Sequence, residues 1–99
     1  DCSGFVDWAF YNASGGSYIP GQGGGAAAQH GQCVDNPWEE VQPGDLVFYP
    51  EDDHVGIAAG RDGQGRLLVV HCAAGAGGVT LSGSDGFTQA ARPGWYGEE

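Results

Sequence analysis

The chain has few positively charged residues. Lysine and arginine together number 3 in 99 residues, against 13 aspartates and glutamates, and the formal net charge is −10. Tight binding to nucleic acid depends on cationic side chains that displace the counterions of the phosphate backbone. The charge balance therefore argues against nucleic acid as a partner.

Long hydrophobic runs are also missing. No apolar stretch approaches the roughly 20 residues that span a bilayer, and no basic and then apolar leader opens the chain. We therefore expect no membrane span in this chain. Because the first residue is Asp1 and not methionine, we also expect that an upstream segment has been removed.

Cysteine is scarce and occurs only as Cys2, Cys33 and Cys72. Three cysteines cannot all pair, so at least one thiol is free or bonded elsewhere, and the count leaves both the redox compartment and a Cys33 to Cys72 pairing open. Zinc is disfavoured because no two cysteines form a C-x-x-C pair, and adjacent His71 and Cys72 point to opposite faces of a strand. We expect no metal and no cofactor.

The length and composition indicate one small domain over residues 1–99. A chain of this length supports one modest core. Hydrophobic residues make up 40% and include three tryptophans, whereas 20 glycines and 5 prolines predict many turns. We expect short elements on a loop-rich frame.

The apolar pattern predicts an α+β fold, with one helix packed on an antiparallel sheet. Residues 2–13 carry apolar side chains at offsets of three and four, which is typical of an amphipathic helix, and Asp1 stands at its N-cap. Residues 14–40 are expected to be a long loop with one short helical turn at 26–30. Strands are expected at 45–49, 54–60, 66–72 and 78–81, with a return to the sheet within 87–96.

A predicted hairpin relates two histidines. Asp62-Gly63 is typical of a two-residue type I′ turn, which would place His54 directly opposite His71 on one face. A three-residue loop would put them on opposite faces, and a four-residue loop would restore the shared face. One neutral imidazole accepting a hydrogen bond from the other is the geometry of a base and its orienting group. The alternative is that each histidine only fills a half-buried strand position.

Cys2 is expected at the start of the first helix. The helix dipole and unpaired backbone N–H groups favour its thiolate form, and the same N–H groups can hold an oxyanion. Cys2, His54 and His71 would then act as nucleophile, base and orienting group. A small buried hydrophobe is the equally weighted alternative for Cys2. Cys33 and Cys72 have no such setting, and we expect them to be structural or incidental.

Four blocks, DCSGFV, PGDLVFY, HVGI and VVHC, occur in this order over residues 1–72. In these blocks the chain resembles the NlpC/P60 family of cell-wall cysteine peptidases. The resemblance implies a papain-like fold, with Cys2 as nucleophile, His54 as base, His71 as its orienting residue, and Asp1 and Ser3 helping to hold the substrate. It also implies a secreted, cell-wall enzyme that hydrolyses peptidoglycan stem peptides, typically between D-γ-glutamate and the following diamino acid.

The sequence departs from the family pattern in three places. Family members carry a segment before the D-C-S-G block, usually with a tyrosine and a Gly-Gly pair, so we expect a domain truncated at its N-terminus and additional domains upstream. The Gly-rich stretch 15–31 is an unusual loop and a candidate border of the cleft. Glu51, Asp52 and Asp53 precede the base; their charge favours imidazolium at His54, unless they form only a solvated turn.

The sequence leaves two other functions open. One is a catalytically silent wall-binding module that keeps the cleft without turnover. The other is an amidase or acyltransferase that uses the same cysteine. Turnover, and the products formed from defined muropeptides, distinguish these functions from an endopeptidase.

Overall fold

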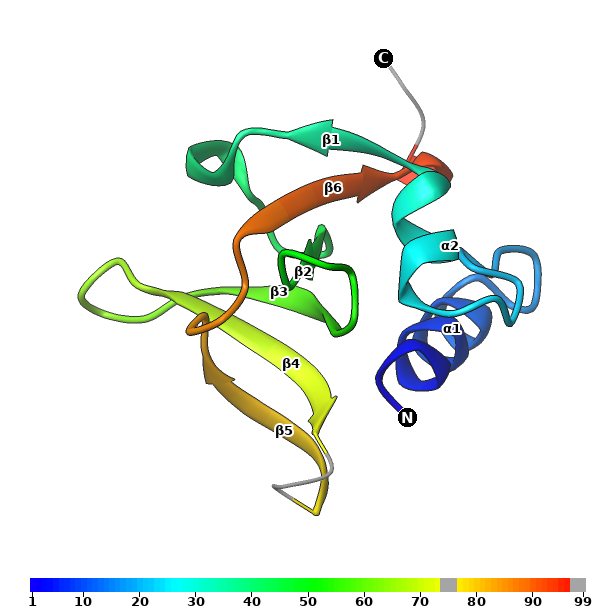
Figure 1. Cartoon of the computed structure of the whole chain (residues 1–99), viewed down its shortest axis with the longest axis horizontal. Helices are drawn as coiled ribbons and strands as arrows, with labels where there is room; N and C mark the ends of the chain where they lie inside the picture. Colours follow the sequence, from blue (N-terminus) through cyan, green and yellow to red (C-terminus); the bar gives the residue numbers. More distant parts are fainter. Residues whose placement is uncertain (74–76, 97–99) are drawn as a thin grey trace.

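The computed structural model describes residues 1–73 and 77–96. Its strands form one antiparallel sheet in the order β1-β6-β2-β3-β4-β5, and two helices lie on one side of it (Figure 1). The predicted α+β architecture is confirmed. The elements are α1 (Cys2–Ala13), α2 (Ala26–Gly31), β1 (Cys33–Asn36), β2 (Leu46–Phe48), β3 (Val55–Arg61), β4 (Leu67–Ala73), β5 (Gly78–Gly83) and β6 (Gln89–Pro93), with short 3-10 turns at Trp38–Glu40 and Gly94–Tyr96.

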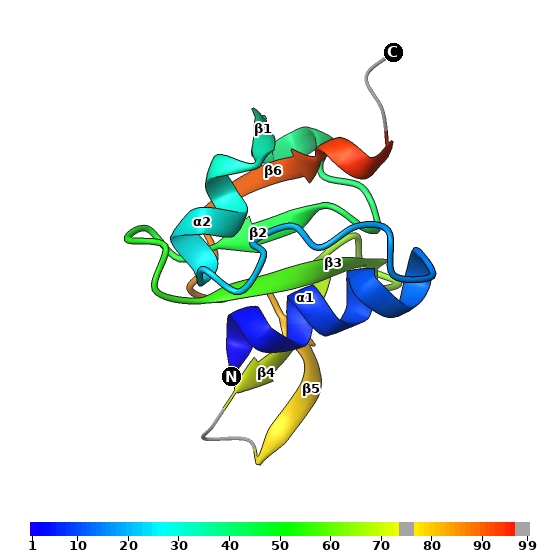
Figure 2. The same cartoon turned by 90° about the vertical axis from the view of Figure 1, so that its right-hand side faces the viewer.

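Helix α1 begins and ends at the predicted residues. The Asp1 carboxylate accepts a hydrogen bond from Gly4 N at 2.8 Å and so caps the helix. Val6 and Phe10 form its buried face, which packs against β3 and β4 (Figure 2). In both views the N-terminus of α1 lies beside the start of β3 and the end of β4.

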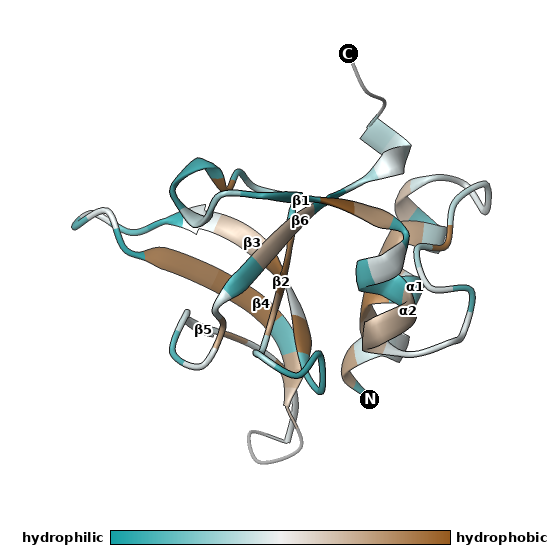
Figure 3. Ribbon diagram, turned by 45° about the horizontal axis from the view of Figure 1, so that its top comes forward, coloured by the Kyte–Doolittle hydropathy of each residue, from teal (hydrophilic) through white to brown (hydrophobic). Residues whose placement is uncertain are grey.

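The core occupies both faces of the sheet because neighbouring strand residues alternate. On the helix side, Leu46 and Phe48 pack with Phe10 of α1. On the other side, Val47 packs with Val69 of β4. Hydrophobic residues run along β2 and β4 (Figure 3). Strand β2 is thus buried on both faces and forms the centre of the sheet.

Strand β1 corrects the expectation of a continuous loop over residues 14–40. At the edge of the sheet it pairs with β6, from Cys33 opposite Pro93 to Asn36 opposite Ala90. Val34 and Asp35 at its centre are both exposed. Because this edge strand is held by backbone hydrogen bonds and not by a buried face, no period-two pattern marks it in the sequence. The short helical turn expected at 26–30 is confirmed as α2.

The Gly-rich connection between α1 and α2 folds back onto α1. The Asp7 carboxylate accepts hydrogen bonds from Gly21 N at 2.9 Å and Gly23 N at 3.0 Å. Gln29 of α2 is fully buried and donates from Nε2 to Ser3 O at 2.8 Å and to Asp7 at 2.9 Å. These bonds hold the loop and α2 against the first turns of α1.

The β3–β4 hairpin does not use the predicted two-residue turn. Asp62 N donates to Arg66 O at 2.9 Å, so the loop consists of Gly63, Gln64 and Gly65. Gly65 takes the left-handed conformation that such a loop requires, with φ of 82°. An odd loop of this kind, taken alone, would put the two histidines on opposite faces.

A β-bulge compensates for the odd loop. The register shifts between Ala58 and Gly60, which adds one residue on β3. On the side of the bulge toward the start of β3, Ile57 pairs with Val70. Continuing the same register places His71 opposite Gly56. The histidines therefore share a face, as predicted, but the prediction that they lie directly opposite each other is wrong.

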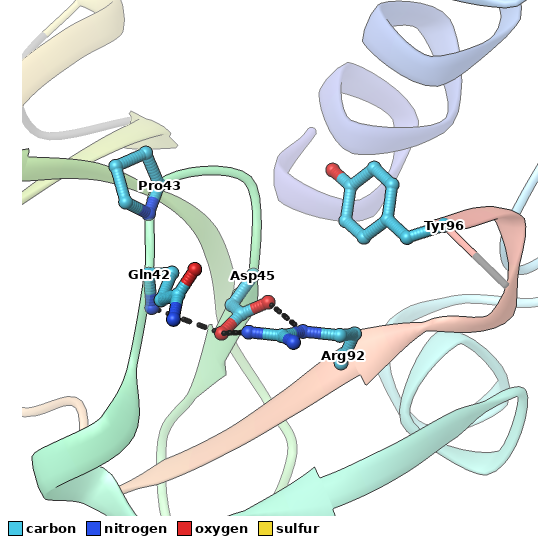
Figure 4. A pocket seen from close by; sticks show the side chains of 5 residues that line it. All are labelled: Gln42, Pro43, Asp45, Arg92 and Tyr96. Atoms are coloured by element: carbon cyan, nitrogen blue, oxygen red, sulfur yellow. Dashed lines mark hydrogen bonds and ion pairs between the residues drawn. The ribbon is translucent and has the colours of Figure 1, made fainter. Parts of the chain in front are cut away.

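The buried Asp45 carboxylate links the start of β2 to β6 and β1, and Figure 4 shows its contacts with Gln42 and Arg92. Asp45, only 1% exposed, accepts hydrogen bonds from Arg92 Nε at 2.9 Å and Nη2 at 3.2 Å. It also accepts from Asn36 Nδ2 at 3.1 Å and from Gln42 N at 3.0 Å. The buried charge is therefore paired and fully hydrogen-bonded, as a buried ion requires. Tyr96 borders the same pocket.

Substitution of this carboxylate should destabilise the fold. We expect Asp45→Asn to lower the free energy of unfolding by about 3 kcal/mol, because it leaves the surrounding donors without their charged acceptor. The matched control is Asp85→Asn in an exposed loop, with an expected change within about 0.5 kcal/mol. Urea unfolding measures both. Equal losses in the two variants would contradict the assigned role of Asp45.

Candidate active site

His54 and His71 are in direct contact. His54 precedes β3 and His71 lies in β4; the distance from His54 Nε2 to His71 Nδ1 is 2.8 Å, and the rings meet at 77°. This hydrogen bond needs one protonated and one bare nitrogen, so the two imidazoles cannot both be cationic while it is made. A Cβ at Gly56 would lie 3.0 Å from His71 Cβ and would clash with Val69 Cγ1, which explains the glycine in the H-V-G-I block.

Aromatic rings enclose this pair. The Phe87 centroid lies 5.6 Å from that of His54 and 5.2 Å from that of His71, and Tyr49 lies 4.9 Å from His54. Burial lowers the pKa of His54, and the nearby charge of Asp53 offsets this only in part. Burial and then the charge of His54 lower the pKa of His71. Both imidazoles are therefore favoured in the neutral form at neutral pH.

The acidic run before His54 does not make this histidine cationic, which corrects the expectation of an imidazolium. Glu51 and Asp53 are exposed. Asp52 faces away toward other partners: its Oδ1 lies 2.9 Å from His30 Nδ1 and accepts from Gln89 Nε2 at 3.2 Å. Residues 51–53 therefore form the expected solvated turn only in part, because the Asp52 side chain has protein partners.

His30 lies between two carboxylates, an arrangement that the sequence did not reveal. Its ring stacks on Phe48, with centroids 4.3 Å apart, and its Nε2 lies 2.6 Å from Asp35 Oδ1, with Asp52 on the other side. Burial alone would lower the pKa of His30, but the hydrogen bonds to Asp52 and Asp35 outweigh it and raise that pKa. His30 thereby joins α2 to β1 and to the turn before β3.

Cys2 is the first residue of α1, half-buried against the helix-side core. Within the described part of the chain, its sulfur has no hydrogen bond to either histidine; His54 Nε2 bonds His71, and His71 Nε2 bonds Ser82. The histidine pair instead contacts Phe87 of the core on the other face. The start of α1 lies beside the start of β3, which follows His54, and the end of β4, which contains His71 (Figures 1 and 2).

The other two cysteines have different surroundings. Cys33 donates from Sγ to Gln29 O at 3.2 Å. Burial, and then the charges of Asp35 and Asp45, raise the pKa of its thiol to about 12. Cys33 is therefore a protonated, unreactive thiol. All three cysteines are free, so Cys33 and Cys72 are not paired with each other.

The two remaining predicted site residues flank Cys2. The Asp1 carboxylate caps α1, and the Ser3 carbonyl accepts from Gln29. Their role in holding a substrate stays a prediction. The Gly-rich stretch, which the sequence suggested as a border of the cleft, is held on the first turns of α1 by Asp7.

Two further observations concern metals and membranes. Over residues 1–73 and 77–96, no group of three or more histidine, cysteine, aspartate or glutamate side chains is arranged to hold a metal ion. None of the helices in the same residues has the length and apolar character needed to cross a bilayer.

This architecture defines the chain as a papain-like α+β domain, with a cysteine at the start of its main helix and paired histidines on its sheet. The NlpC/P60 family model matches residues 1–87, and the chain belongs to the NlpC/P60 family.

Two solved structures are similar to the chain. One is the peptidoglycan hydrolase RipB from Mycobacterium tuberculosis, with a TM-score of 0.72 and 29% identity over 93% of this chain and 44% of that one. The other is the P60 domain of an antigen from M. avium subspecies paratuberculosis, with a TM-score of 0.70 and 25% identity over 94% of this chain and 64% of that one. The chain thus spans less than two thirds of either. No curated protein matches it.

The pKa of His30 should be shifted in the opposite direction from the pKa values of His54 and His71. We expect His30 to titrate above the ordinary value of about 6.5, and His54 and His71 below it, in an NMR pH titration. The contribution of His30 to stability is then complete below about pH 6.5 and is lost as the pH rises through its raised pKa. That of His54 and His71 is complete above about pH 6.5 and is lost as the pH falls through their lowered pKa values. A titration of His54 above that of His30 would contradict this assignment.

Proposed function

We propose that this chain is the catalytic domain of a cysteine endopeptidase that hydrolyses peptidoglycan stem peptides. Cys2 is the nucleophile, His54 the base and His71 the group that orients the base. The observation that carries the proposal is the His54 to His71 hydrogen bond, which occupies His54 Nε2 and leaves its Nδ1 as the nitrogen that can take a proton. Membership in the NlpC/P60 family and the likeness to RipB, a peptidoglycan hydrolase, support the substrate class.

The chemistry follows from groups of this chain. Cys2 Sγ attacks the carbonyl carbon of the substrate amide, and His54 Nδ1 takes the thiol proton. The amide C–N bond then breaks, and His54 returns the proton to the leaving amine. Water, deprotonated by the same histidine, attacks the resulting thioester and releases the acid and Cys2.

The oxyanion of each tetrahedral intermediate can be held by the start of α1. Of the first N–H groups of the helix, that of Gly4 donates to the Asp1 carboxylate and that of Phe5 to Asp1 O at 3.0 Å. The N–H groups of Cys2 and Ser3 have no partner within the helix and are the donors closest to the sulfur in sequence. We assign the oxyanion contact to these two groups.

The finer features of the proposal come from the family resemblance. The bond cut is the one between D-γ-glutamate and the following diamino acid, and Asp1 and Ser3 help to hold the stem peptide beside Cys2. Since peptidoglycan lies outside the cytoplasmic membrane, the protein acts as a secreted or cell-wall enzyme.

Loss of the nucleophile tests this function. We expect Cys2→Ala to lower kcat/KM for a defined muropeptide by on the order of 10⁴-fold or more, because the proposed acyl-enzyme forms on the Cys2 thiol. The matched control, Cys72→Ala, should retain activity. Mass spectrometry of the products measures both variants and identifies the bond cut.

Other product patterns would replace the proposal. Hydrolysis that survives in Cys2→Ala would exclude the cysteine mechanism. Release of intact stem peptide from the glycan, or transfer of the acyl group to an added amine, would indicate an amidase or an acyltransferase. Muropeptide binding without turnover, unchanged in His54→Ala, would indicate a wall-binding module.

A further inference from the structure

Ser82 lies behind the histidine pair, on the neighbouring strand β5. Strand β5 pairs with β4 so that Val69 lies opposite Ser82 and His71 opposite Thr80. Ser82 is therefore the diagonal neighbour of His71 on the same face. Its Oγ lies 2.8 Å from His71 Nε2, the ring nitrogen not used by His54.

The hydroxyl of Ser82 has a second partner that decides the direction of this bond. Ser82 Oγ donates to the Gly83 carbonyl at 2.9 Å. A carbonyl oxygen only accepts, and a serine hydroxyl has one hydrogen to donate. Since Ser82 Oγ donates its one hydrogen to the Gly83 oxygen, Ser82 Oγ accepts from His71, and the hydrogen of the neutral His71 ring is on Nε2.

The position of the hydrogen on His71 in turn fixes that on His54, because the two rings share a hydrogen bond. A neutral His71 with its hydrogen on Nε2 has a bare Nδ1, which accepts from His54 Nε2 at 2.8 Å. His54 then carries its own hydrogen on Nε2, and its Nδ1 is bare. Among the described residues, Nδ1 of His54 has no hydrogen-bond partner, so it is the nitrogen open to a thiol proton.

The opposite arrangement would disable this nitrogen. If Ser82 donated to His71 Nε2, the hydrogen of His71 would move to Nδ1 and be donated to His54 Nε2. Neutral His54 would then carry its hydrogen on Nδ1, the nitrogen that the proposed mechanism uses as base. The Ser82 hydroxyl, which donates to the Gly83 carbonyl, thus determines whether His54 Nδ1 is free to accept a proton.

We propose that Ser82 is a positioning residue that sets the tautomers of His71 and, through it, of His54. The catalytic part of this inference rests on the proposed function; the tautomer part does not. The burial that lowers the pKa of both histidines keeps them in the neutral forms for which a tautomer is defined.

The test compares Ser82→Ala with Ser82→Thr, which keeps the hydroxyl, and with Ser84→Ala, the same change two residues further along the chain. In the unsubstituted chain, ¹⁵N NMR of the imidazoles should show hydrogen on Nε2 and a bare Nδ1 for both His54 and His71. Ser82→Ala should lose this single tautomer, and Ser82→Thr and Ser84→Ala should keep it. In turnover assays, Ser82→Ala should lower kcat by about 10-fold or more at unchanged KM, as loss of a group that orients a catalytic ligand does.

Each outcome bears on the proposal separately from the enzyme activity. Hydrogen on Nδ1 of His54 in the unsubstituted chain overturns the proposal, even if Ser82→Ala fails to fold. Unchanged tautomers in a folded Ser82→Ala also overturn it. Absence of hydrolysis by the unsubstituted chain would instead count against the proposed function, and the NMR result would still decide the role of Ser82.

Discussion

The proposed chemistry depends on the hydrogen bond between His54 and His71, and that bond requires a register of β3 and β4 that puts both side chains on one face. The three-residue loop that ends at Gly65 would by itself put the two side chains on opposite faces, and the bulge between Ala58 and Gly60 restores the shared face. Neither feature alone would bring the side chains to one face. The turn and the bulge therefore act together, and Gly56 leaves the space that His71 occupies.

A small number of buried polar groups hold the elements around this pair. Arg92, one of only three basic residues, pairs with buried Asp45 and joins β6 to the start of β2. On the helix side, Asp7 and Gln29 fasten the Gly-rich loop and α2 to the first turns of α1, where Cys2 lies. The excess of acids noted in the sequence thus includes carboxylates with defined structural partners.

Local signals predicted most of the fold. The bounds of α1 follow from its apolar period and the cap at Asp1, and the strands of the β3–β4 hairpin follow from apolar runs beside turn residues. Strand β1 could not be found in this way, because its exposed residues carry no alternation and its partner lies far along the chain. The shared face of the histidines was predicted, whereas the register was not, because the observed loop and the bulge together displace the pairing by two residues, which keeps the same face.

The less predictable parts of the site are those set by tertiary contact. Asp52, a partner of His30, is 22 residues away, and Ser82 is 11 residues from His71, so neither pair has a local signature. The position of Cys2 at a helix start was predictable because capping acts over a single turn. The separation of Cys2 and His54 was not predictable, since it depends on how the helix packs on the sheet.

The most direct test of the account is the reactivity of Cys2. Alkylation by iodoacetamide at neutral pH, followed residue by residue with mass spectrometry, compares the three thiols in one molecule. The account predicts that Cys2 reacts faster than Cys72 and much faster than Cys33, whose thiol pKa is about 12, and that His54→Ala slows Cys2 alone. A Cys2 that reacts no faster than the other two, or that is indifferent to the loss of His54, would contradict it.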